Sequence, residues 1–232
     1  MRNFLIILAA VLGFASAGHA ADNQTTVEVG GKNITVPLPA GMADSAAAGE
    51  KAIAFAQSVT PKGNRALLLL VPQDQVAALA TEAKPALLKY AMLQSNREFN
   101  DRNVSPEMFS FVSRFVKSQI LGKEAVLNKA VQQGAKEAAT EAKNISLGET
   151  KPLMMIRDDK RAMSSLLLMK IAYNKDGTSF DIPLLSSMSL VHLQSRVLYA
   201  YVYTIYLDES DLNWIKTTTE QWLKDMIAAN PA

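Results

Sequence analysis

Cysteine is absent from the 232-residue sequence, which excludes disulfide bonds and metal sites built from thiolates. Histidine occurs only twice, and His19 lies in the apolar N-terminal region described below. The remaining His192 cannot alone supply the two or three histidines of the common zinc sites. No glycine pair has the spacing of a phosphate-binding loop. The sequence therefore predicts no metal site and no cofactor.

The sequence also lacks an excess of one charge sign, and it has few glycine and proline residues, which break regular structure. The chain has 24 basic and 22 acidic residues, so nucleic-acid binding has no electrostatic support. It has only 11 glycines and 9 prolines, while 49% of its residues are hydrophobic. This composition is typical of a globular protein with a substantial core.

Long apolar runs are absent apart from Phe4–Phe14, about 11 residues that follow the positive charge of Arg2 and precede small residues up to Ala20. This order is typical of a secretory signal peptide. A membrane-spanning helix needs about 20 apolar residues, so we expect cleavage near Ala20 and no membrane span afterwards. The expected organisation is a signal peptide over 1–20 and a single α+β domain over 21–232, in a protein that is periplasmic or secreted.

The first half of the domain mixes strands and helices. Alternating residues around Gly30 and Gly31 predict a hairpin of Val27–Val29 and Ile34–Val36. Further expected elements are an alanine-rich helix over Ser45–Ser58, a strand buried on both faces over Ala66–Val71, and a strand over Tyr90–Glu98.

Two helices are expected in the middle of the chain. Ser105 and Pro106 are typical of a helix start, and apolar residues then recur every three or four positions and predict one apolar face. These residues are Met108, Phe111, Val112, Phe115, Val116 and Ile120. Lys123–Lys143 is also predicted to be helical, as one helix or as two divided by a glycine.

The last part of the chain predicts four strands and a closing helix. Short turns separate the strands, so neighbouring strands should be antiparallel. Their ranges are Leu153–Arg157, Met163–Tyr173, Leu184–Leu193 and Val197–Leu207, and a helix starting at Asp208 or Ser210 runs to Asn230. The expected fold class is α+β: an α/β/α sandwich around a mainly antiparallel twisted sheet, with a C-terminal four-strand meander followed by a closing helix.

This order of elements, with an aromatic last strand and a tryptophan-bearing final helix, resembles the PsbP-like α/β/α sandwich superfamily. The resemblance covers about Thr25 to Ile227 and concerns pattern only. Because that superfamily includes diverse binding and accessory proteins, it implies a scaffold and no particular reaction. It assigns a role to no residue.

Tyr199, Tyr201 and Tyr203 lie two residues apart, so they share one face of the expected last strand. One interpretation is core packing against Trp222 of the closing helix. The other is a binding wall, for which the candidate ligand-binding residues are these three tyrosines, Trp222 and His192.

Two functions from different classes follow from these observations. The leading hypothesis is an exported periplasmic protein, a non-enzymatic binding or envelope accessory protein whose partner is an envelope protein or a small ligand. The alternative is a small hydrolase that uses His192, although no Gly-x-Ser-x-Gly motif marks a nucleophile. In a third hypothesis, an envelope-structural role, the helix over Pro106–Leu121 or the alanine-rich segment after it docks on a membrane or a partner. Neither segment has a strongly basic face, which disfavours a membrane surface.

Overall fold

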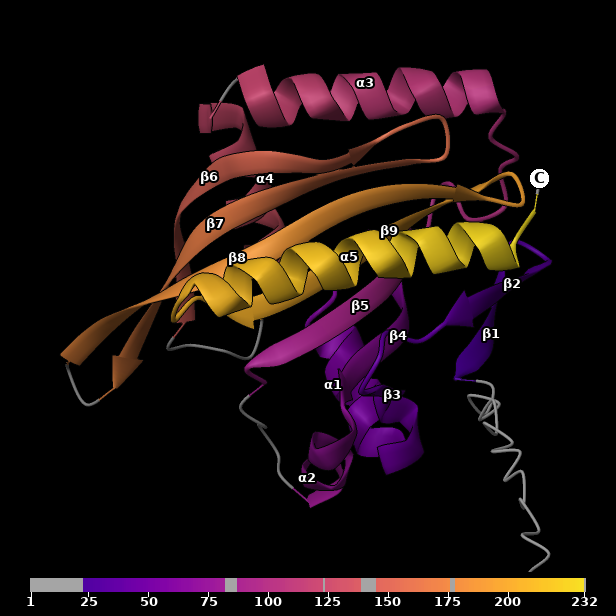
Figure 1. Cartoon of the computed structure of the whole chain (residues 1–232). Coiled ribbons are helices and arrows are strands. Elements are labelled where there is room, and N and C mark those ends of the chain that lie inside the picture. Colours follow the sequence, from indigo (N-terminus) through magenta and orange to yellow (C-terminus); the bar gives the residue numbers. More distant parts are fainter. Residues whose placement is uncertain (1–22, 82–86, 123, 139–144, 176–177, 232) are drawn as a thin grey trace, which may run out of the picture.

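The computed structural model describes residues 23–81, 87–122, 124–138, 145–175 and 178–231 (Figure 1). The expected signal peptide and its cleavage position lie outside these residues. Within them, no helix has the length and apolar character needed to cross a membrane.

The chain starts with the expected hairpin. Strands β1 (Gln24–Val29) and β2 (Lys32–Pro37) pair antiparallel and form a two-stranded sheet of their own. Gly30 and Gly31 form the two-residue turn with φ of 56° and 71°. Both angles lie in the left-handed region that glycine adopts at little cost, and this explains the glycine pair.

A seven-stranded antiparallel sheet forms the centre of the molecule, in the order β3-β4-β5-β9-β8-β7-β6. The last four strands form the expected meander. Pairing between β5 and β9 joins the two halves of the chain at the middle of the sheet. The strands are β3 (Met42–Asp44), β4 (Asn64–Pro72), β5 (Lys89–Asn96), β6 (Ile145–Asp158), β7 (Ala162–Lys175), β8 (Thr178–Leu193) and β9 (Arg196–Ile205).

Helices cover both faces of this sheet, so the predicted α+β class and sandwich are confirmed (Figure 1). Helix α5 (Glu209–Ala229) packs on one face together with the hairpin, and α3 (Pro106–Gly122) and α4 (Glu124–Ala138) pack on the other. Asp208 caps α5 by accepting from Ser210 N at 2.7 Å, as its position before the helix predicts. A third core cluster lies where α1 (Glu50–Ser58) and α2 (Val76–Thr81) meet β4 and β5.

Some helix predictions need correction. The expected helix over Ser45–Ser58 is divided at Gly49, whose φ is 90°, into a short 3-10 helix, η1 (Ser45–Ala48), and α1. The 3-10 helix η2 (Gln73–Gln75) and α2 were not expected. In the segment 123–143, the described part is one helix, α4, which continues through Gly134.

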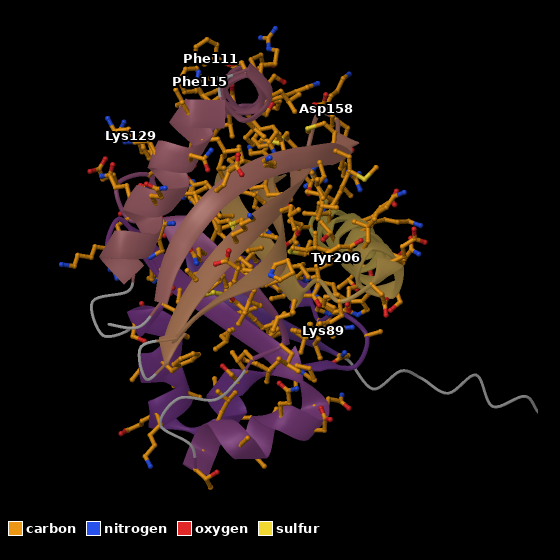
Figure 2. The ribbon with its side chains drawn as sticks, turned by 90° about the vertical axis from the view of Figure 1, so that its left-hand side faces the viewer. Lys89, Phe111, Phe115, Lys129, Asp158 and Tyr206 are labelled. Atoms are coloured by element: carbon orange, nitrogen blue, oxygen red, sulfur yellow. The ribbon has the colours of Figure 1, made fainter. Side chains whose placement is uncertain are left out.

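The expected apolar face of α3 is only partly correct. Phe109 and Ile120 are buried and Val112 and Val116 pack beside them, but Phe111 and Phe115 are 63% and 58% exposed. Figure 2 shows both side chains on the outer side of the helix. The helix therefore turns its aromatic stripe away from the sheet and uses Phe109 as its core aromatic.

Candidate functional site

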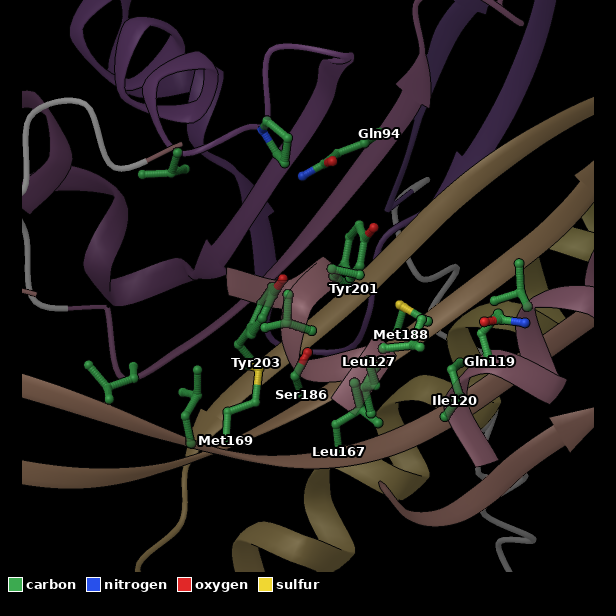
Figure 3. Close-up of a pocket in the computed structure, with 18 of the residues that line it drawn as sticks. Gln94, Gln119, Ile120, Leu127, Leu167, Met169, Ser186, Met188, Tyr201 and Tyr203 are labelled. Atoms are coloured by element: carbon green, nitrogen blue, oxygen red, sulfur yellow. The ribbon is translucent and has the colours of Figure 1, made fainter. Parts of the chain in front are cut away.

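A cavity of about 530 Å³ lies between the sheet and helices α3 and α4 (Figure 3). The connection between α1 and β4 closes one side through Val59 and Pro61. Most of the lining is apolar and comes from β7, β8, α3 and α4: Val116, Ile120, Val126, Leu127, Ala130, Val131, Leu167, Met169, Ile171, Leu184 and Met188.

Two members of the predicted tyrosine row line this cavity. Tyr201 and Tyr203 point to it from β9, with ring centroids 6.0 Å apart. Tyr90 of β5 stands directly opposite Tyr203 in the strand register and stacks on it at 4.6 Å. Tyr199 continues the row, 6.5 Å from Tyr201, but does not line the cavity. The row is therefore a half-buried aromatic wall: Tyr201 and Tyr203 line the cavity, and Tyr199 lies outside it.

Burial keeps the phenol groups of this wall protonated. It raises the pKa of Tyr203 to about 12, although a hydrogen bond with Ser186 lowers that pKa in part. Burial also raises the pKa of Tyr201 and of Tyr90, and the neighbouring charge on an ionised Tyr203 would raise both further. At neutral pH the wall therefore presents uncharged hydroxyl groups.

Gln94, Ser186 and Gln119 of α3 add three neutral polar groups to the lining. Gln94, on β5, is 3% exposed; its Oε1 accepts from Asn64 Nδ2 at 2.9 Å, and its Nε2 approaches Met92 Sδ at 3.9 Å. Ser186, on β8, stands opposite Tyr203 in the register. Among the described residues, no aspartate, glutamate, lysine, arginine or histidine lines the cavity.

Trp222 lies on the opposite face of the sheet from the tyrosine row, so its expected packing against that row is wrong. It belongs to the core between α5 and the sheet, is 2% exposed, and donates from Nε1 to Pro37 O at 2.9 Å. Successive side chains of β9 alternate between the two faces. The residues that alternate with the tyrosines, Leu198, Ala200 and Val202, pack towards α5.

His192 is on the same face as the tyrosines but away from the cavity. Its ring stacks on Phe109 with centroids 5.3 Å apart, and its Nε2 lies 2.7 Å from Val104 O. Burial lowers the pKa of His192, the hydrogen bond to Val104 raises it, and the charge of Arg161 lowers it. In the described part of the chain, no recorded hydrogen bond joins His192 to a serine or an aspartate.

Several cavity residues were missed from the sequence. Tyr90, Gln94 and Met188 come together only because β9 pairs with β5 on one side and β8 on the other. Met188 could have been predicted to lie on this face, because it is an even number of residues from His192 on β8. Among the described residues, no group of three or more histidine, aspartate or glutamate side chains could hold a metal ion.

No protein-family model matches this sequence, and no curated protein matches it significantly. Solved structures do match: the Ran-binding protein Mog1p of Saccharomyces cerevisiae, at 12% identity over 90% of this chain and 95% of that chain, has a TM-score of 0.39. A mutant of the protein Mog1 has 12% identity over 89% and 94% of the two chains and a TM-score of 0.38. Likeness at this level assigns neither a fold family nor a partner to this chain.

These matches correct two expectations. The PsbP-like resemblance is withdrawn: no family model matches the sequence, and the solved structures reported above are Mog1 proteins. The functional description as a periplasmic, signal-peptide-bearing accessory protein, with a small hydrolase as its alternative, is withdrawn too: neither matched protein carries that description, and one of them is described as Ran-binding. Cellular location is a separate matter that none of these findings tests, and it stays a prediction.

Proposed function

We propose that this protein binds a small, predominantly apolar molecule in the cavity between the sheet and helices α3 and α4. The cavity itself is the observation that carries the proposal. Its volume of about 530 Å³ falls within the range of about 300–1,000 Å³ that is typical of small-molecule sites.

The composition of the lining supports the same function. Ligand sites are usually apolar and carry a few polar groups that orient the ligand, and this cavity combines aliphatic and methionine side chains with Tyr201, Tyr203 and Gln94. Methionine adapts to ligands of different shape, and Met169 and Met188 both line the cavity. An unfilled apolar space costs stability, so filling it with a ligand should be favourable.

Titration with the neutral fluorescent dye N-phenyl-1-naphthylamine tests this proposal. We expect saturable binding at one site per chain, and Met188→Trp should weaken it at least tenfold because the indole fills the cavity. Met154→Trp is the matched control: Met154 is 39% exposed on β6, does not line the cavity, and should leave the affinity unchanged.

A second pair of variants keeps the test decisive if Met188→Trp fails to fold. Ala130 lines the cavity from α4 although it is exposed, so Ala130→Trp should occupy part of the cavity, whereas the neighbouring Lys129 does not line it and Lys129→Trp should leave it open. The proposal is wrong if the dye shows no saturable binding, or if the cavity-filling variants bind it as tightly as their controls do.

A further inference from the structure

Most polar groups of the cavity lie on one of its walls, and the amide of Gln119 on α3 is the exception. Gln94, Tyr201, Tyr203 and Ser186 come from the adjacent strands β5, β9 and β8, as Figure 3 shows. The wall made by β7 and α4 is apolar, with Leu167, Met169 and Ile171 on the strand and Leu127 and Val131 on the helix. The cavity therefore has a polar side and an apolar side.

The polar side retains hydrogen-bond donors for a ligand. The Gln94 Nε2 group points at a thioether 3.9 Å away, and sulfur is a weak acceptor, so a ligand oxygen would be a better partner. Burial raises the pKa of Tyr201 and Tyr203, so both phenols keep the hydroxyl proton that a ligand oxygen can accept. Gln94 is almost fully buried, and a buried donor without a strong acceptor is costly.

The charge of the lining restricts the ligand further. A carboxylate or an ammonium group that enters an apolar cavity loses its hydration, and only an opposite charge or several hydrogen bonds can compensate. The described lining residues carry no ionisable acid or base other than tyrosine.

We propose, building on the function proposed above, that the ligand is an uncharged amphiphile. Its apolar body lies against β7 and α4, and one neutral oxygen, a hydroxyl or a carbonyl, faces Gln94, Tyr201 and Tyr203. The site thus selects a long-chain alcohol or similar neutral molecule over a fatty acid anion of the same length.

Competition against N-phenyl-1-naphthylamine at pH 8 tests the charge selectivity. We expect 1-decanol to displace the dye at a concentration at least tenfold lower than decanoate or decylammonium. Equal displacement by either ion would overturn the inference, although binding of the dye itself would still support the proposed function. No saturable dye binding at all would instead refute the proposed function.

A second comparison tests the orientation of the oxygen. The double variant Tyr201→Phe/Tyr203→Phe keeps both rings and removes both hydroxyls, so the preference for 1-decanol over 1-fluorodecane should fall about 3–10-fold. Tyr199→Phe removes the same group from the same row outside the cavity and should change nothing. An unchanged preference in the double variant would show that the hydroxyls of Tyr201 and Tyr203 do not bind the oxygen and would overturn this part of the inference.

Discussion

Asn230 completes the hydrogen bonding of Thr35 as a neighbouring strand would. Its Nδ2 donates to Thr35 O at 2.7 Å, and its Oδ1 accepts from Thr35 N at 3.0 Å. The same Nδ2 donates to Met226 O at 2.8 Å, so one fully buried amide joins the end of α5 to strand β2.

Asn230→Asp should therefore destabilise the protein by about 1–3 kcal/mol, because it keeps the shape but removes a buried donor shared by two carbonyl groups. The free energy of unfolding in urea measures the loss. Asn23→Asp is the control: Asn23 is exposed, its side chain donates to Leu38 O over 3.5 Å, and the change should stay within about 0.5 kcal/mol. Equal effects at the two sites would contradict the role of Asn230.

The two turn glycines should differ sharply in their tolerance of alanine. A Cβ on Gly30 would lie 2.3 Å from Asn100 O and 2.8 Å from Arg196 Nε, whereas a Cβ on Gly31 meets nothing within 4 Å. Gly31→Ala should cost about 1–2 kcal/mol from its positive φ alone. Gly30→Ala should cost about 3 kcal/mol or more, because the clash adds to the same strain.

The clash at Gly30 also disturbs a buried cation. Arg196 donates from Nη2 to Gly30 O at 2.7 Å and from Nε to Val29 O at 3.2 Å. Thermal and urea unfolding of the two variants compare them directly. A loss for Gly31→Ala as large as that for Gly30→Ala would show that backbone conformation, and not packing, explains both.

Trp222→Ala should reduce the free energy of unfolding by about 3–5 kcal/mol, because it opens a large space in the core beneath α5. Trp222→Phe keeps most of the apolar contact and loses the bond to Pro37 O, so its cost should be smaller. Since Trp222 faces away from the cavity, dye affinity in the folded fraction of Trp222→Phe should equal that of the wild type. Altered affinity without altered stability would contradict this placement.

His192 makes stability depend on pH in mildly acidic solution. Burial lowers the pKa of His192 in the folded state, so the unfolded chain binds the proton more readily. Stability should be full above the ordinary pKa of about 6.5 and should fall as pH decreases from about 7 towards 5. Melting temperatures across this range measure the slope.

His192→Gln is the informative variant, because glutamine can still donate to Val104 O but does not titrate. The difference in melting temperature between wild type and variant should shrink as pH falls. Asp159 and Asp211, whose pKa values are lowered, lose their stabilising contribution only at more acidic pH. A slope that persists unchanged in His192→Gln would assign the effect to another group.

The alternation of apolar and polar residues predicted the inner strands of the meander well and its edge strand, β6, poorly. Alternation identified β7, β8 and β9, but β6 begins at Ile145, earlier than expected, and passes through Pro152. A proline lacks the backbone donor of a central strand, but β6 is at the edge of the sheet and pairs with β7 through several bulges. Position in the sheet, which the local sequence does not specify, made this strand possible.

The candidate site was only half predictable for a related reason. The tyrosine row was evident from spacing, yet both faces of β9 are apolar enough to lie under a helix, so alternation could not decide which face meets Trp222. Gln94 and Tyr90 enter the cavity through pairing with β9 across more than 100 residues of sequence. Such nonlocal register is a property of the whole sheet and not of any segment.

The alternation of β9 places different constraints on substitutions and on changes of length. Replacing Tyr201 or Tyr203 changes the cavity and leaves the contacts of α5 in place, so ligand preference can vary without loss of the fold. Inserting or deleting one residue within β9 would instead move the tyrosines beneath α5 and turn Ala200 and Val202 to the cavity. Sequences that keep this fold can therefore vary at the tyrosine positions, with a changed ligand preference, but should preserve the length of the strand.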